Sequence, residues 1–264
     1  MDRSIPVWLR AFFLLVMVQA LVVALGVVAP ALIPRLLPWD ASPLNARFIA
    51  ALYAMGWLST LLCLRAHSYA ETRIVLIEVG LVTMLLLLIT LPRLAEFVPP
   101  RPFPWGWLLS YLADPLLVAA LLWRMRGRDA VPPGRSRLAP LFWAYALVLG
   151  AAGMVLLALP DLAARIWPWE LPAVLGQIYS TFFLGIAACA LLAARDPRPS
   201  ATRIFTIANL FVLALVLVVS LLHLNRFAAG ASAWAWFGLC GLGVMAFGRA
   251  LLQRRSARLA GSLS

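Results

Sequence analysis

The sequence predicts an all-α polytopic integral membrane protein, with about eight transmembrane helices arranged as two parallel four-helix repeats. Three observations support this class: of the 264 residues, 64% are hydrophobic and only 12% are charged, and the mean hydropathy is +0.95. Soluble globular domains are about half apolar and about a quarter charged, so a water-soluble core does not account for this composition. A bilayer does, because each crossing helix needs about 20 apolar residues.

Apolar runs long enough to cross the hydrocarbon core as helices occur eight times along the chain. We expect spans at 11–33, 44–64, 74–91, 104–123, 138–159, 171–194, 204–222 and 233–252. The first run is too long for a removable signal peptide and lacks a small-residue cleavage site. The connections are short and leave no room for a separate soluble domain.

The stretch 30–97 recurs at an offset of 130 positions, which indicates an internal duplication. Arg65 then matches Arg195, and longer matches pair Pro38-Trp39-Asp40 with Pro168-Trp169-Glu170 and Thr72-Arg73-Ile74 with Thr202-Arg203-Ile204. A unit with an even number of spans returns to its starting side, so both copies face the same way. We therefore expect a first four-span unit at 1–123, a basic linker at 124–137 and a second unit at 138–264.

The arginines are distributed unevenly between the two sides of the predicted bundle. The net charge is +12, and sixteen of the 22 basic residues fall on the side of the chain ends and the linker. The other side carries Arg35, Arg47, Arg93, Arg101, Arg165 and Arg226. The positive-inside rule then places both termini in the cytoplasm, in a bacterial plasma (inner) membrane whose anionic headgroups are the expected partner. This distribution explains the charge without nucleic acid.

The tryptophans cluster on the opposite side, where they are typical of an interfacial aromatic belt. They are Trp39, Trp105, Trp107, Trp167, Trp169, Trp234 and Trp236. Cys63, Cys189 and Cys240 lie in apolar runs without metal-ligand spacing, and we expect neither a metal site nor a cofactor. HExxH, P-loop and GxSxG motifs are absent from the sequence, so it favours a protein that is not an enzyme.

Asp114 is the first candidate for a polar site within a span. It lies ten residues from Pro104 and ten from Arg124, which places it near the bilayer midplane at about 1.5 Å per residue. Pro115 cannot donate to the carbonyl one turn back, so we expect a kink there. A carboxyl beside a broken helix resembles the cation or proton sites of transporters, and an Asp that only stabilises packing is the alternative.

Three further charged residues are weaker candidates. Glu78 follows Arg73 by five residues, about 7.5 Å along a helix, so we expect it to pair with arginine. Its repeat equivalent is Ala208, which confines any role to one unit. Glu96 and Arg226 occupy equivalent positions in the two units, and they form either an inter-repeat pair or two separate solvated charges.

The residues Ser42 to Tyr53 form a motif at the start of the second span. Ser42 is expected to cap the helix and Pro43 to occupy its first position. Asp40, Asn45 and Arg47 then form a candidate outer-surface motif. The segment resembles a group of uncharacterised bacterial multi-pass membrane proteins that carry (Ser/Thr)-Pro-Leu-Asn-Ala-Arg-Phe-Ile-Gly-Ala-Leu-Tyr, with an Ala in place of the Gly here. The resemblance extends loosely through the first unit, and it implies a membrane fold but no particular activity.

Three functions remain open at this point. The sequence favours a transporter-like protein for a small solute, a proton or an ion, on the basis of the duplication and of Asp114. The alternative is a non-catalytic accessory or lipid-interacting subunit, with a membrane-protein partner or a second copy of the chain. A third reading, an intramembrane lipid-modifying enzyme, rests only on Asp40, Asn45 and Arg47. A simple role for Arg47 as a headgroup anchor is favoured over the third reading.

Overall fold

The computed structural model describes residues 5–261 apart from 38, 40, 97–101 and 129, and it describes side chains except those of 95, 96, 102–104 and 254–261. Within this part of the chain, eight helices are long and apolar enough to cross a membrane. They belong to α1 (Val7–Ala24), α3 (Pro43–Leu64), α4 (Tyr69–Thr90), α5 (Pro102–Arg124), α6 (Ala139–Ala158), α8 (Ala173–Ala194), α9 (Arg203–Leu222) and α10 (Ala231–Gly261). The chain is therefore an all-α polytopic membrane protein, as predicted.

The expected span 11–33 is wrong at both ends. Helix α1 starts earlier, at Val7, and its last turn η1 (Leu25–Val27) ends before Pro30. Pro30 instead opens a separate pair of short turns, η2 (Pro30–Leu32) and α2 (Ile33–Leu36), and the residues 130 positions later form α7 (Pro160–Ile166). A proline at the first position of each segment fits, because its missing N–H is not needed there.

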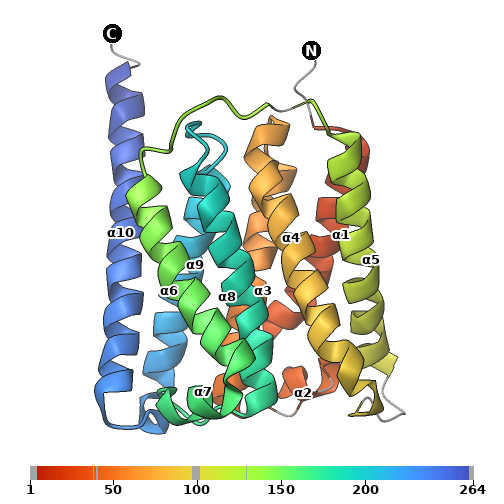
Figure 1. Ribbon diagram of the computed structural model, residues 1–264, viewed down its shortest axis with the longest axis vertical. Coiled ribbons are helices and arrows are strands. Elements are labelled where there is room, and N and C mark those ends of the chain that lie inside the picture. The colour runs from red at the N-terminus through yellow and green to blue at the C-terminus, as the bar shows by residue number, and fades with distance from the viewer. Residues whose placement is uncertain (1–4, 38, 40, 97–101, 129, 262–264) are drawn as a thin grey trace.

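The eight long helices form an inner and an outer set. In α3, α4, α8 and α9, between 50% and 72% of the membrane window is buried inside the protein, against 17% to 33% in α1, α5, α6 and α10. The outer helices therefore present most of their surface to lipid. In Figure 1 α10 and α5 stand at the two edges of the bundle, with α3, α4, α8 and α9 between them.

The packing of the inner helices crosses between the two halves of the chain. Helix α3 packs against α1 of its own half and against α9 of the other half, while α8 packs against α6 and against α4. Helices α4 and α9 in turn hold the outer helices α5 and α10. Neither half therefore forms its inner interfaces alone.

Helix α1 begins and α10 ends at the same end of the bundle, at the top of Figure 1, where the α5–α6 connection also lies. We call this the basic end, because its connections and adjoining helix termini carry Arg65, Arg73, Arg124, Arg126, Arg128, Arg135, Arg137, Arg195, Arg198 and Arg203. The short helices α2 and α7 lie at the other end, which we call the opposite end.

Two local predictions from the sequence can be compared directly with helix geometry. The Ser42 side chain accepts a hydrogen bond from the backbone N–H of Asn45, and Pro43 is the first residue of α3, so the predicted cap is confirmed. Helix α5 is continuous from Pro102 to Arg124 with Pro115 inside it, and the expected kink stays a prediction. Because Pro115 has no backbone N–H, the carbonyl of Tyr111, one turn earlier, lacks its helical donor.

The tryptophans of the opposite end do not all form a belt. Trp105 and Trp234 are exposed, as the belt interpretation requires, but Trp39, Trp107 and Trp169 are buried in the protein core. Trp169 packs edge-on against Phe48 at 5.5 Å and against Trp236 at 4.9 Å between ring centroids. These aromatic residues therefore fix the contact between α3 and the second half.

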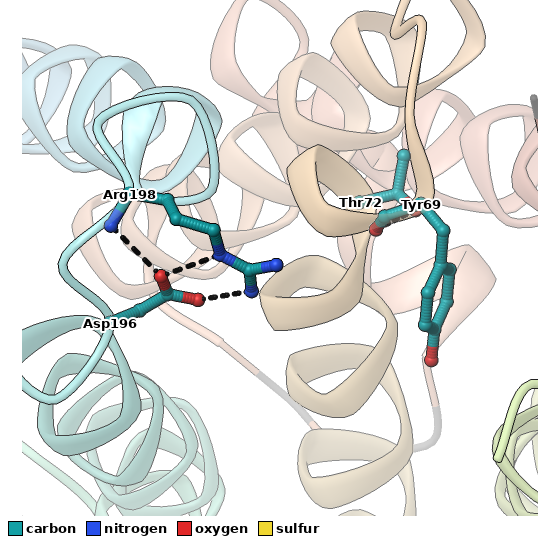
Figure 2. Close-up of polar contacts among 4 residues, drawn as sticks. All are labelled: Tyr69, Thr72, Asp196 and Arg198. Atoms are coloured by element: carbon teal, nitrogen blue, oxygen red, sulfur yellow. Dashed lines mark hydrogen bonds and ion pairs between the residues drawn. The ribbon is translucent and has the colours of Figure 1, made fainter. Parts of the chain in front are cut away.

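A partly buried ion pair between Arg198 and Asp196 orders the connection after α8 at the basic end. Asp196 accepts hydrogen bonds from the Arg198 backbone N–H at 3.0 Å, from Nε at 2.9 Å and from Nη2 at 2.6 Å. Figure 2 shows the guanidinium directed toward the first turn of α4, where Thr72 donates to the Tyr69 carbonyl. Burial alone would raise the pKa of Asp196, but the hydrogen bonds from Arg198 and the charges of Arg198 and Arg73 outweigh it and hold that pKa below its usual range.

Candidate functional site

A cavity of about 80 Å³ lies among α1, α3, α4 and α5, closed on one side by Phe182 of α8. We call it the polar cavity after the polar residues among those that line it, although the surface that they expose to the space is almost entirely apolar; they are Gln19, Tyr53, Ser59, Glu78, Thr83, Ser110, Tyr111 and Asp114. A water needs roughly 10–15 Å³ by this measure, so the volume of the cavity corresponds to about five waters. It is too small for an organic solute of drug size, whose pockets begin at about 300 Å³.

Two carboxyl groups line the polar cavity, and each has an oxygen with no hydrogen-bond partner within the described part of the chain. Asp114 is 2% exposed and Glu78 is 6% exposed, and Asp114 Oδ1 and Glu78 Oε1 are both buried and unpaired. The Ser59 hydroxyl, in the same lining, is also unpaired. Among the described residues Glu78 forms no ion pair, so the expected pairing with arginine is not found. An isolated carboxylate costs several kcal/mol in such surroundings, so these groups need a proton, a cation or water.

Hydroxyl and amide groups border these carboxyls. The Tyr53 and Tyr111 hydroxyls share a hydrogen bond of 2.8 Å, which joins α3 to α5 one turn before Asp114. Gln19 Nε2 donates to Ser110 Oγ at 3.1 Å, and this bond spans the gap between α1 and α5. One side-chain hydrogen bond therefore links two lipid-facing helices beside the polar cavity.

Sequence reasoning found Asp114 and Glu78 but not their neighbours. The missed signal is helical spacing: Trp107, Ser110 and Asp114 recur at three- and four-residue intervals and so share one face of α5. On α3, Tyr53, Gly56 and Ser59 do the same. A search for polar residues along one face of each span would have found the set.

The second half carries a cavity at the corresponding place, and its lining is apolar. It measures about 440 Å³ and lies among α6, α8, α9 and α10, with Phe48 and Leu52 of α3. Moving the polar-cavity positions on by 130 residues, or by 129 in the last helix, pairs Gln19 with Leu149, Tyr53 with Phe183, Thr83 with Leu213, Ser110 with Leu239, Tyr111 with Cys240 and Asp114 with Gly243. We call this second space the apolar cavity.

At the opposite end, two hydrogen-bond sets correspond at the same offset. Arg47 Nε donates to the Val27 carbonyl at 3.1 Å, and Arg47 Nη1 donates to His223 Nε2 at 2.6 Å. At the positions 130 residues on or back, Gln177 Nε2 donates to the Leu157 carbonyl at 3.4 Å, and Gln177 Oε1 accepts from Arg93 Nη2. Each set therefore joins the start of an inner helix to the far half of the chain.

Asn45 does not project to the outer surface, as the sequence reading expected. It is 1% exposed, and its Oδ1 accepts from Trp169 Nε1 at 2.7 Å and from the Tyr179 hydroxyl at 2.9 Å. Its Nδ2 donates to the Glu170 carbonyl at 3.1 Å. All three partners belong to the second half, so Asn45 is a buried link between the two halves.

The remaining candidates are placed only in part. Asp40 and the Glu96 side chain lie outside the described residues, so the pair of Glu96 with Arg226 stays a prediction. Arg226 is exposed at the end of η4 (Leu224–Arg226). The described residues hold no cluster of three or more His, Cys, Asp or Glu that could bind a metal ion.

Comparison with known proteins adds no relative. No protein-family model matches the chain, and no curated protein or solved structure matches it significantly.

Proposed function

We propose that this protein is a transporter-like membrane protein that passes protons or a small monovalent cation through the polar cavity. The observation that carries the proposal is the pair of unpartnered carboxyls, Asp114 and Glu78, in one cavity of about 80 Å³. Ionisable groups are costly inside a membrane, and they are typical of ion and proton pathways. The size of the cavity favours a proton or a small ion over an organic solute.

The proposal includes an architecture of two parallel repeats related by a pseudo-twofold axis along the membrane normal. Three correspondences at the 130-residue offset support it: α3 with α8 over their whole lengths, the segment 30–36 with α7, and the two hydrogen-bond sets of Arg47 and Gln177. Helix α3 packs on α9, and α8 packs on α4, so a shift of 130 residues along the chain interchanges the members of the two contacts. In a two-fold assembly, the same surface of each unit contacts the other unit.

The proposed orientation places the basic end in the cytoplasm of a bacterial inner membrane. The arginines in the connections of that end support this orientation through the positive-inside rule. Their guanidinium groups would attract anionic headgroups, which are the proposed lipid partner.

Two alternative functions are less well supported. An intramembrane enzyme would use Asn45 and Arg47, but the hydrogen bonds of both side chains are already made within the protein. A non-catalytic accessory subunit would need no buried carboxyls without partners. A stable co-purifying membrane protein at fixed stoichiometry would nevertheless favour the accessory function.

The test uses purified protein in vesicles that enclose a pH-sensitive dye, with a potassium diffusion potential as the driving force. We expect proton influx above that of empty vesicles, and at least a tenfold decrease in Asp114→Asn and in Glu78→Gln. The matched control is Asp161→Asn, in exposed α7, which should transport like the wild type.

Vesicles with wild-type protein that are as tight as empty ones, for protons and for Na⁺ or K⁺, would contradict the proposal. Equal rates in wild type and Asp114→Asn would contradict the assigned pathway. Monodisperse elution of each variant in size-exclusion chromatography separates these outcomes from misfolding.

A further inference from the structure

The apolar cavity has the shape and position of a site for a lipid chain. Its lining runs along α10 from Ser232 to Phe247, fifteen residues or about 22 Å of helix. That length exceeds one leaflet of the hydrocarbon core, which is about 15 Å. Its volume of about 440 Å³ falls within the range of ligand pockets, but its elongation favours a single chain over a compact solute.

The apolar cavity borders the lipid directly. Leu239 and Leu242 belong to its lining, and they are 52% and 61% exposed on the outer helix α10. Helices α6 and α10 both hold inner helices but do not pack extensively on each other. In the first half, the corresponding gap is bridged by the bond from Gln19 to Ser110, whereas Leu149 and Leu239 stand at these positions here. A chain in the bilayer therefore meets no polar closure.

Among the residues that the structure describes, one buried donor in the lining has no hydrogen-bond partner. The Trp167 indole N–H is buried and unpaired, and Trp167 lines the apolar cavity at the opposite end of the bundle. Its ring is held by Trp169 at 5.3 Å and by Trp236 at 5.5 Å between centroids. A buried donor without an acceptor is destabilising, and an acceptor at the end of an apolar chain would remove that cost. Trp167 directly follows α7, at the end of the bundle where tryptophans are expected near the lipid headgroups.

We propose that the apolar cavity binds one acyl chain of a membrane phospholipid, with its ester carbonyl accepting a hydrogen bond from Trp167 Nε1. The chain enters sideways between α6 and α10 and lies along α10. This inference does not depend on transport through the polar cavity, since neither Asp114 nor Glu78 lines the apolar cavity.

The experiment uses the full-length protein in phosphatidylcholine vesicles that contain a photoactivatable phosphatidylcholine with a diazirine in one acyl chain. Peptide mass spectrometry gives the labelling of 239–247 relative to that of lipid-facing Leu14 and Val18 on α1. We expect this ratio to be well above one. It should fall at least fivefold in Ala152→Phe, whose ring fills the cavity. Ala151→Phe, one residue earlier on the exposed face of α6, is the matched control and should keep the wild-type ratio.

A second arm tests the hydrogen bond with Trp167→Phe. Loss of one neutral hydrogen bond should lower the ratio roughly two- to tenfold for the ester-linked probe, and should leave the ratio for an ether-linked probe unchanged. Equal effects on both probes would overturn the carbonyl contact. Equal labelling of 239–247 and of α1, or an unchanged ratio in Ala152→Phe, would overturn the site. Stronger competition by an unlabelled isoprenoid alcohol than by phosphatidylcholine would overturn the choice of occupant.

Discussion

Single side chains join the two halves of this protein, and Arg47 is the most informative of them. Its guanidinium joins the Val27 carbonyl to His223, and Gln177 makes the corresponding bonds 130 residues later. The residue types differ, but each makes two hydrogen bonds: Arg47 donates both, whereas the Gln177 amide donates one and accepts one. The position is therefore shared by hydrogen-bonding role rather than by charge.

Replacement of Arg47 tests this role. We expect Arg47→Ala to lower the free energy of unfolding by about 1–3 kcal/mol, because a carbonyl and an imidazole lose their donor. Arg47→Gln should retain most of the stability, since glutamine serves at position 177. Thermal unfolding followed by size-exclusion chromatography measures both variants. Equal loss in the two variants would show that charge, rather than hydrogen bonding, matters at this position.

His223 gives the same contact a pH dependence. Burial of the ring, followed by the charges of Arg47 and Arg226, lowers the pKa of His223 below 6.5. The unfolded chain then binds the proton more tightly, so this contribution to stability is present above about pH 6.5 and is lost as the pH falls toward the lowered pKa. We expect the thermal midpoint to fall between pH 7.5 and 5, and the fall to be smaller in His223→Gln. An identical profile in the variant would exclude His223 as the cause.

Asp196 responds to acid in a lower range. Its lowered pKa means that its contribution to stability is present above about pH 3.8 and is lost as the pH falls through the pKa of the folded state. At neutral pH we expect Asp196→Asn to cost about 1–3 kcal/mol, because charge-assisted hydrogen bonds from Arg198 are lost. Exposed Asp161→Asn is the control. Equal midpoints for Asp196→Asn and wild type at pH 7 would contradict this account.

Sequence reasoning reached some residues and not others for a physical reason. Asp114 and Glu78 are conspicuous because any ionisable group in an apolar run is costly. The burial of Asn45 could not be foreseen, because its partners Trp169 and Tyr179 lie 124 and 134 residues away. The helical period shows which residues share a face, but it does not show which helix that face meets.

At the scale of helices, close approach between α4 and α8 depends on Gly185. A Cβ at this position would lie 2.5 Å from Val82 Cγ2. Valine has little freedom to move aside, because its branched side chain is stiff at χ1. The glycine therefore sets the distance of one of the two interfaces that cross between the halves.

Substitution of two glycines by alanine tests this interface. We expect Gly185→Ala to lower the free energy of unfolding by about 1–3 kcal/mol through overpacking. Gly238→Ala on α10 has no atom within 4 Å of the added Cβ and should be neutral or slightly stabilising. The difference between their thermal midpoints is the measurement. A Gly185→Ala midpoint at or above that of Gly238→Ala would contradict close packing here.

The long helices could be predicted from the sequence, and the short ones could not. Apolar runs of about 20 residues separated by arginine-rich connections leave little ambiguity, and α3 also begins at its predicted cap. Helix α2 has only four residues and follows an apolar run, so the expected span 11–33 extends into it, and α7 has only seven residues, too few to show a helical period. Only the prolines at 30 and 160 mark where a separate segment starts.

At the scale of the whole molecule, the eight crossings bring both ends of the chain to one side, and this can be tested by labelling. Cys63, Cys189 and Cys240 are buried, so the background reaction with an impermeant thiol reagent should be low. We expect Ser200→Cys, at the basic end, to react only from the cytoplasmic side, and Gly230→Cys, at the opposite end, only from outside. Reaction of both from one side would overturn the topology, and exchanged sides would overturn the proposed orientation.

The crossed packing of α3 with α9 and of α8 with α4 has a consequence for the ancestry of the chain. On the proposed duplication, an ancestor with one unit would have left two large helix faces uncovered, so it had to pair with an identical molecule before the two copies were fused. In such a pair of identical molecules, every substitution in one pocket also appeared in the other. Fusion removed that constraint, and one descendant pocket could keep acidic groups while the other lost them.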